Sequence, residues 1–503
     1  MSTDFDDARG IVRADLEERQ AVRRLFDRDH TLWRDDPTEV ADRLGWIPVV
    51  EEVLDDLPGL SARCDALVEG IDDVIVMGMG GSSLFPEVLA RTLEPAPGRP
   101  RLHVLDTTDP AAIARVADSC PPARTLHLAS SKSGSTIETR SHLEWAWARS
   151  AGTGRFAVIT DPGSALGDLA RERGFADVFE NRADLGGRYS ALSLCGVVPA
   201  LLMGADVAAL LRGGLAALAD SGPEVESGRN PALHVAAALA AGVRTGRDKA
   251  TVVLPDEVAT LGLWIEQLLA ESLGKDGTGV TPIVGEPVSD AEVYGDDRVF
   301  LSTEPLDHLE AAGHPVVAFD AGPTEAEIGY TVVTLELATA LTGAALGVQP
   351  FDQPDVAAAK AATNAVLAEG GVDGPLRPLE ELLALVQPGD HLALQVFGDP
   401  GDHEAHVLDA VRVALRDRLR VAVSLGFGPR FLHSTGQLHK GGPRTIVCVQ
   451  VVAPDQEKIA IPGQAFGFGH LKQAQAAGDL RTLHARGIRA GRVDLHGLLA
   501  IAP

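Results

Sequence analysis

A loop crowded with hydroxyl side chains is the part of this chain whose residue types most clearly point to chemistry. Residues 126–139 read LHLASSKSGSTIET, with an apolar run before the loop and a helix-like pattern after it. The polar residues of this loop, here called the serine loop, are Ser130, Ser131, Lys132, Ser133, Ser135 and Thr136. Hydroxyls and an ammonium group at the start of a helix can donate hydrogen bonds to phosphate oxygens. One serine is enough to cap a helix, so this density favours a phosphate-binding loop over a simple N-cap.

A glycine-rich loop, here called the glycine loop, precedes another predicted helix. Residues 76–83 read VMGMGGSS and end a short β-branched run. Gly78 and Gly80 match two positions of the dinucleotide pattern G-x-G-x-x-G, but Ser83 stands at the third, while Asp106 ends the next predicted strand. A nicotinamide site, a phosphate or sugar site and a plain tight turn all stay open.

Two further segments place single charged residues where catalysis could use them. In DLGGRYSALS, residues 184–193, Arg188 follows two glycines and could reach an oxyanion; the alternative is a surface salt bridge. In WIEQLLAESLGKDGTG, residues 264–279, Gln267 and Glu271 lie four residues apart on one helix face. Glu271 faces the negative end of the helix dipole, a cost that suits a general base better than a structural residue. Glu266 is the competing carboxylate, and an exposed glutamate at a frayed helix end is the alternative.

Later segments supply a lysine and two histidines. PFDQPDVAAAK, residues 350–360, places Lys360 on a helix that begins near Pro354 and Asp355. RFLHSTGQLHKGGP, residues 430–443, contains His433 and His439, and histidine is the usual proton shuttle near neutral pH. An ordinary surface loop is the alternative for this second segment.

The elements that must position these residues follow an alternating pattern. Residues 8–69 are predicted to be mostly helical, and strands and helices alternate from 71 onward, including strands at 155–160, 249–256, 314–320 and 330–337. The prediction is an α/β protein with parallel-type sheets in doubly wound domains. Its parts are a helical arm (1–70), a first domain (71–220), a second domain (221–368) and, after a Gly/Pro-rich linker at 369–378, a smaller C-terminal α/β segment (369–503).

Composition limits the partners. The 503 residues carry a formal net charge of −27, which argues against nucleic acid and anionic membranes but not against a small anionic substrate held by local donors. The four cysteines are far apart, so neither a disulfide framework nor a zinc site is expected. Without a signal-like N-terminus or a run of about 18 apolar residues, we expect a cytoplasmic protein with no membrane span.

Taken in order, the motifs resemble those of glucose-6-phosphate isomerases. The matching segments are GMGGSS, SSKSGSTIET, LGGRYS, EQLLAESLGK and FDQPDVAAAK, and HSTGQLHKGGP is similar to the isomerase half of fused transaldolase/glucose-6-phosphate isomerase proteins. The resemblance covers roughly residues 70–475 and implies two sugar-isomerase (SIS-type) domains with a helical N-terminal arm.

The resemblance also implies residue roles. The phosphate would be held by Gly81, Ser82, Ser131, Lys132, Ser133, Ser135 and Thr136. Glu271 would be the base with Gln267 beside it, Arg188 next to Gly187 would stabilise an enediolate, and Lys360 would assist ring opening. The family pattern carries GVE where this chain has PDVA, and its ring-opening histidine normally precedes the lysine, whereas His433 and His439 follow it. His433 is ranked slightly above His439.

The implied reaction is the reversible isomerisation of glucose 6-phosphate and fructose 6-phosphate through a cis-enediolate, with neither metal nor redox cofactor. A sugar phosphate is the expected partner, and a homodimer is an open option for the assembly. Two rival classes remain. A non-catalytic sugar-phosphate sensor would not need Glu271 or Arg188, and a nicotinamide oxidoreductase is disfavoured by Ser83 and the serine loop.

Overall fold

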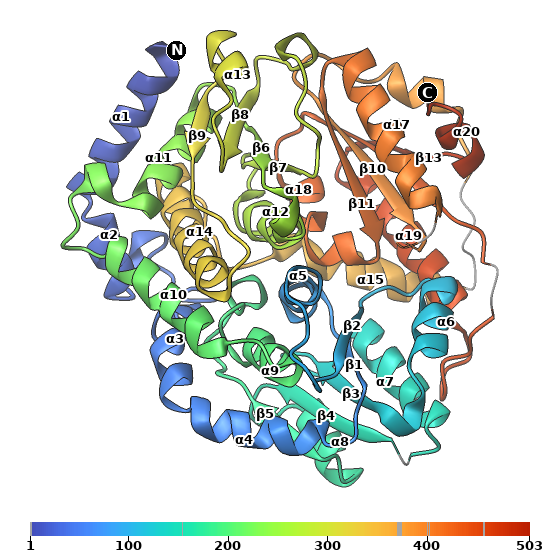
Figure 1. The fold of residues 1–503 in the computed structure, drawn as a ribbon. Coiled ribbons are helices and arrows are strands. Elements are labelled where there is room, and N and C mark those ends of the chain that lie inside the picture. The colour runs from blue at the N-terminus through green and yellow to red at the C-terminus, as the bar shows by residue number, and fades with distance from the viewer. Residues whose placement is uncertain are drawn as a thin grey trace.

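Three parallel β-sheets form the framework of the molecule (Figure 1). The computed structural model describes residues 3–152, 154–369, 375–399, 401, 403–455 and 458–502. The first sheet has the order β2-β1-β3-β4-β5. Its strands are β1 (Asp73–Met77), β2 (Arg101–Leu105), β3 (Thr125–Ser130), β4 (Arg155–Thr160) and β5 (Asp177–Glu180).

The other two sheets repeat the start of this order. The second is β7-β6-β8-β9, and the third is β11-β10-β12-β13. Their strands are β6 (Lys249–Val253), β7 (Thr281–Val284), β8 (Arg298–Ser302), β9 (Val316–Ala318), β10 (His391–Phe397), β11 (Ala422–Gly428), β12 (Ile446–Val452) and β13 (Arg489–Arg492). In each sheet the chain leaves the first strand to one side and returns to its other side, which is the doubly wound arrangement expected from the sequence.

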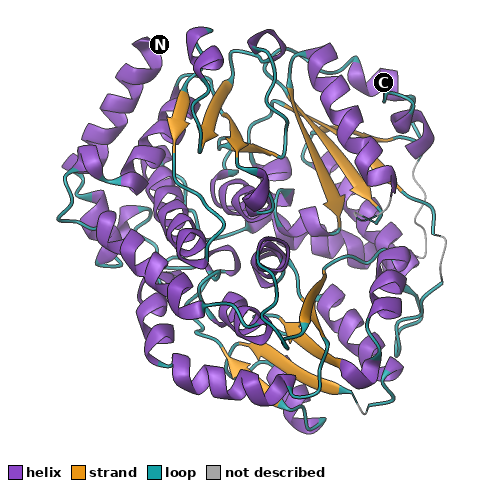
Figure 2. Ribbon diagram, in the orientation of Figure 1, coloured by secondary structure: helices purple, strands orange, loops and turns teal. Residues whose placement is uncertain are grey.

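Helices connect and cover the sheets (Figure 2). The N-terminal arm contains α1 (Thr3–Glu18), α2 (Ala21–Phe26), α3 (Trp46–Asp55) and α4 (Leu57–Val68). Around the first sheet follow α5 (Leu84–Thr92), α6 (Pro110–Ser119), α7 (Ile137–Arg149) and α8 (Ala165–Glu172), and then α9 (Leu194–Met203), α10 (Val207–Asp220) and α11 (Pro231–Arg244). The later helices are α12 (Leu261–Leu273), α13 (Asp307–Ala311), α14 (Glu325–Leu346), α15 (Pro354–Glu369), α16 (Leu379–Leu383), α17 (His403–Leu419), α18 (Gly436–Gly441), α19 (Phe468–Ala485) and α20 (Leu495–Leu499).

Helix α14 corrects the strand predicted at 330–337. The β-branched run is typical of a strand, yet it lies inside a 22-residue helix that begins with a capping box between Thr324 and Glu327. The helix packs against α10 and α11, so tertiary contacts override the local preference for a strand. By length and composition α14 could cross a membrane, but 94% of its apolar stretch is buried inside the protein, as in a core helix.

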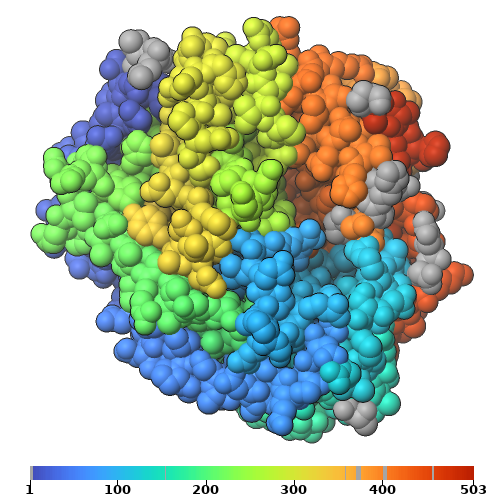
Figure 3. All heavy atoms as spheres, viewed as in Figure 1, coloured from blue at the N-terminus to red at the C-terminus, as the bar shows by residue number. Residues whose placement is uncertain are grey.

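Four short strands were not predicted from the sequence: β5, β7, β8 and β13. Each has only four or five residues, too few to show a clear period. Half of the linker predicted at 369–378, residues 370–374, lies outside the described residues. In the space-filling view the three sheet-bearing parts meet near the centre of the visible face (Figure 3).

Candidate active site

The glycine loop and the serine loop lie at one edge of the first sheet. The glycine loop follows β1 and the serine loop follows β3, which are paired neighbours in the sheet. The chain crosses to opposite sides after these strands, so their carboxyl ends open the crevice where doubly wound sheets bind ligands.

Three backbone segments meet above this crevice. Gly80 has φ 55°, and a Cβ there would come within 2.9 Å of the His433 carbonyl oxygen. A Cβ on Gly81 would overlap the carbonyl oxygen of Gly187. The glycines are therefore needed for close approach between segments far apart in the sequence, in addition to any contact with a ligand.

The hydroxyls of the serine loop bond partly to one another. Ser131 Oγ accepts from the Gly134 N–H at 3.2 Å and lies 3.4 Å from Thr136 Oγ1, while the Ser133 and Ser135 hydroxyls are 2.8 Å apart. Gly134 has φ 69°, which favours glycine at the turn of this loop. The loop is thus held in shape by the groups predicted to bind phosphate.

Lys132 is engaged with the neighbouring loop. Its Nζ lies 2.7 Å from a carboxylate oxygen of Asp161 and donates to the Ala183 carbonyl oxygen at 2.6 Å. Burial raises the pKa of Asp161, and Lys132 partly opposes that shift. Ser82, Lys132 and Gly187 line a small cavity of about 30 Å³.

Arg188 is buried at the junction of three segments. Its side chain is 2% exposed, so a surface salt bridge is the wrong interpretation. The guanidinium donates to Ser272 Oγ at 2.8 Å, to Gln353 Oε1 at 2.9 Å, and to the carbonyl oxygens of Pro350 and Asp352. Its Nη1 also lies 3.5 Å from Glu271 Oε1. This fixes a permanent positive charge next to a carboxylate.

Glu271 lies in the last turn of α12 and is buried, which excludes an exposed glutamate at a frayed helix end. Gln267 Nε2 donates to Glu271 Oε2 at 3.0 Å and to the His433 carbonyl oxygen at 2.9 Å. The glutamine amide thus joins the catalytic candidate on α12 to the C-terminal segment.

The competing carboxylate, Glu266, has a different environment. Burial raises its pKa to about 7, although Arg412 and Arg430 act in the opposite direction. Between the ordinary pKa of 4.5 and about 7, the unfolded chain loses this proton while the folded protein keeps it. Since the folded state then binds more protons, Glu266 makes the protein less stable as the pH rises through that window.

Replacing Glu266 by glutamine should remove this penalty. Relative to the wild type, the free energy of unfolding of Glu266→Gln should increase by roughly 2–3 kcal/mol between pH 4.5 and pH 8. Chemical denaturation at both pH values measures the difference. Glu257→Gln, at an exposed position before the same helix, is the control and should show no such change. Parallel pH dependence in the Glu266 variant and the wild type would contradict the expectation.

Lys360 and His433 line one cavity, together with Ser135 and Thr136 of the serine loop. The cavity has a volume of about 460 Å³ and lies between the start of α7, helix α15 and the C-terminal segment. His433 Nε2 lies 3.0 Å from Glu138 Oε1. Burial alone would raise the pKa of Glu138, but the His433 charge and hydrogen bond, with Lys360, hold that pKa below its ordinary value.

His439 is not brought to this cavity. Its ring lies in the third sheet's core, with Nδ1 2.9 Å from Gln395 Nε2 and the ring of Phe431 5.9 Å away. Burial lowers the pKa of His439 well below its ordinary value. Although only six residues separate it from His433, α18 turns its side chain away from the cavity lining.

Several polar residues of the site were missed by the sequence analysis. Glu138 and Gln353 stand inside quoted motifs, STIET and FDQ, so the motifs carried a signal for them. Gln475 and Asp479 line the same cavity from α19 and are buried. Their sequence, QAQAAGD, is typical of an ordinary helix and carried no such signal.

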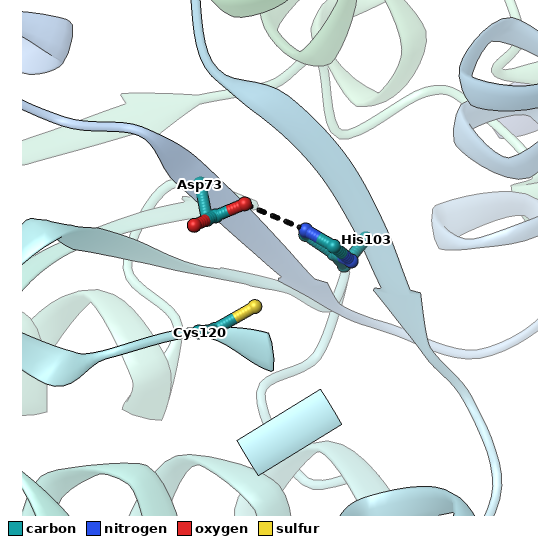
Figure 4. Close-up of side chains that lie close together, drawn as sticks. All are labelled: Asp73, His103 and Cys120. Carbon is teal, nitrogen blue, oxygen red and sulfur yellow. Dashed lines mark hydrogen bonds and ion pairs between the residues drawn. The ribbon is translucent and has the colours of Figure 1, made fainter. Parts of the chain in front are cut away.

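One grouping of side chains resembles a metal site. Among the described residues, Asp73, His103 and Cys120 direct their polar ends toward one another (Figure 4). However, the same oxygen of Asp73 accepts from His103 Nε2 at 2.8 Å and from Arg101 Nε at 3.0 Å. Cys120 is fully buried, and burial raises the pKa of its thiol to about 12. A carboxylate already bonded to two donors beside a protonated thiol does not fit a metal site, and we assign none.

Residues 18–286 match the family model of phosphoglucose isomerase. The chain belongs to the phosphoglucose isomerase family. A glucose-6-phosphate isomerase from Rubrobacter xylanophilus is 32% identical over 374 residues, which cover 60% of this chain and 84% of the relative. One from Thermosynechococcus vestitus is 38% identical over 214 residues, but the chain spans only 40% of that relative's length. The crystal structure of a glucose-6-phosphate isomerase from Chlamydia trachomatis has the same fold, with a TM-score of 0.54 at 18% identity over 64% of this chain and 74% of that one.

The phosphoglucose isomerase match divides the site residues into two groups. The glycine loop, the serine loop, Arg188 and Glu271 fall within residues 18–286, whereas Lys360 and His433 lie beyond that range. These matches carry no information on a transaldolase fusion. Membership of the family agrees with the α/β fold and the parallel sheets described above.

Proposed function

We propose that this chain interconverts glucose 6-phosphate and fructose 6-phosphate, with the base and the enediolate partner supplied by Glu271 and Arg188. The observation that carries the proposal is their contact: a buried guanidinium lies 3.5 Å from a buried carboxylate, inside the segment that matches the family. A coupled assay that converts fructose 6-phosphate to glucose 6-phosphate and then reduces NADP tests it. No turnover by the purified chain would refute it.

Proton transfer is the central step of the reaction. The base removes the proton on C2 of the open-chain aldose, which leaves a cis-enediolate, and returns the proton to C1. The O2 proton passes to O1, so that C2 becomes the carbonyl of the ketose. The enediolate is anionic, so a fixed cation beside it lowers the barrier. Arg188 is held by four hydrogen bonds and needs no reorganisation to act in this way. Gln267 donates a hydrogen bond to the other carboxylate oxygen of Glu271.

Ring opening precedes proton transfer, because the substrate is bound mostly as a closed ring. An acid must protonate the ring oxygen as the C1–O5 bond of the aldose breaks, and the C1 hydroxyl gives up its proton as it becomes the aldehyde oxygen. We assign this role to His433, whose Nε2 faces the Glu138 carboxylate and whose ring lines the cavity. The carboxylate stabilises the imidazolium, and Lys360 adds positive charge at the same cavity.

The serine loop is proposed to hold the substrate phosphate. A double variant, Ser131→Ala with Thr136→Ala, should raise KM for fructose 6-phosphate about 10-fold or more, since several donors to one dianion are lost. Steady-state kinetics give KM, and thermal denaturation reports the effect on the loop's own hydrogen bonds. Ser119→Ala, which removes an exposed hydroxyl at the end of α6, is the control. An unchanged KM in the double variant would refute the assignment of phosphate binding to the serine loop.

The rival functions are disfavoured by particular contacts. A sugar-phosphate sensor gains nothing from a buried Arg188–Glu271 pair. For a nicotinamide enzyme, Asp106 would have to accept a hydrogen bond from the ribose, but both of its carboxylate oxygens already accept from Arg430 at 2.8 Å.

Turnover that survives EDTA and dialysis would agree with a reaction needing no cofactor. A cytoplasmic location and a homodimer remain predictions, and light scattering of the purified protein tests the second.

A further inference from the structure

Glu138 has a second hydrogen-bond partner besides His433. Gln475 Nε2 donates to Glu138 Oε1 at 2.6 Å, and Gln475 Oε1 accepts from Thr108 Oγ1 at 2.7 Å. An ionised carboxylate can only accept hydrogen bonds, so the amide must present its NH₂ group to Glu138 and its oxygen to Thr108. The orientation of the glutamine is therefore set by its surroundings.

These three hydrogen-bonded side chains are buried and link the first sheet to the C-terminal segment. Thr108 lies after β2 of the first sheet, Glu138 lies in the first turn of α7, and Gln475 lies on α19 of the C-terminal segment. Thr108 is 0%, Gln475 is 2% and Glu138 is 3% exposed. In such surroundings a hydrogen bond to a charged group is strong, and its loss leaves a polar atom without a partner.

We propose that Gln475 is a positioning residue for ring opening, which holds the Glu138 carboxylate in contact with His433. One oxygen, Glu138 Oε1, accepts from both Gln475 and His433. Without the amide, the carboxylate can rotate away from the imidazole and no longer stabilise its protonated form. The inference rests on the proposed isomerase function and adds a residue from outside the segment that matches the family.

A glutamate at position 475 tests the idea with almost no change in volume. Gln475→Glu can still accept from Thr108, but it places a second carboxylate against Glu138, and two such groups tend to share one proton. We expect kcat/KM for glucose 6-phosphate to fall about 10–100-fold, and the pH dependence of kcat/KM to shift as the imidazolium loses its carboxylate partner.

The matched control is Gln473→Glu on the same helix. Gln473 Nε2 also donates to a carboxylate, that of Asp455 at 3.0 Å, but at an exposed site. Gln475→Met, which loses the donor without adding charge, covers the case in which Gln475→Glu fails to fold and should also slow the reaction about 10-fold.

A double-mutant cycle separates positioning from packing. If Gln475 acts through His433, then Gln475→Glu should cost less than about threefold in a His433→Asn background. An equal loss in both backgrounds, or activity within twofold of wild type for both Gln475 variants, would overturn the proposal. A wild type without isomerase turnover would instead refute the proposed function, so the two failures are distinct.

Discussion

Replacing Glu271 by glutamine should lower kcat by about 10²–10⁴-fold with little change in KM, because general base catalysis is worth that much. The substitution keeps the shape of the side chain and one acceptor for Gln267 or Arg188, but removes the basic oxygen. Since Arg188 loses part of its charge partner, thermal denaturation should accompany the kinetics. Steady-state rates in both directions give the effect.

Solvent exchange gives a second reading of the same variant. A carboxylic acid that holds the transferred proton can exchange it with water, so isomerisation in D₂O should place deuterium at C1 or C2 of the product. Glu271→Gln should lower both exchange and turnover by about the same 10²–10⁴-fold factor. Glu266→Gln, five residues earlier on α12 and outside the Arg188 contact, is the control and should retain both. An inactive Glu266 variant beside an active Glu271 variant would show that the base is misassigned, and two active variants would remove the proposed mechanism.

Much of the site could be inferred from the sequence, because local sequence patterns place the two loops, Arg188 and the polar residues of α12. The serine loop, the glycine loop and Arg188 each stand next to a strand or a glycine pair, and loops after parallel strands meet at one sheet edge. Glu271 and Gln267 share a helix face, so their contact follows from helix geometry alone. The partner of Arg188 does not follow in this way, since 83 residues separate it from Glu271 and only the packing of α12 brings them together.

The part of the site around His433 depends on contacts between residues far apart in the sequence, which no local pattern encodes. The pairs His433–Glu138 and Gln475–Glu138 join residues 295 and 337 positions apart. The sequence predicts a strand over part of helix α14 because apolar β-branched runs are compatible with either element, and only the packing of the helix decides between them. From the sequence His433 ranks only slightly above His439, but the two histidines lie on different short elements, η9 (Arg430–His433) and α18, and their rings face different surroundings.

That difference between the two histidines leads to a test of the ring-opening acid. His433→Asn should lower kcat/KM for glucose 6-phosphate by at least about 10²-fold, since the acid that protonates the ring oxygen is lost. A four-carbon aldose 4-phosphate has no free hydroxyl that can close a five- or six-membered ring. Its isomerisation, followed as deuterium exchange at C2 in D₂O, should therefore change less than about threefold.

The same substitution at His439 is the matched control. His439→Asn alters a buried side chain of the third sheet's core, with Gln395 as its hydrogen-bond partner, so it should lower the thermal midpoint while kcat/KM falls no more than about threefold. A reversed pattern, with His439→Asn inactive and His433→Asn active on glucose 6-phosphate, would transfer the acid to His439. Equal losses of His433→Asn on the cyclic and the acyclic substrate would mean that His433 does not act in ring opening, because only the cyclic substrate needs that step.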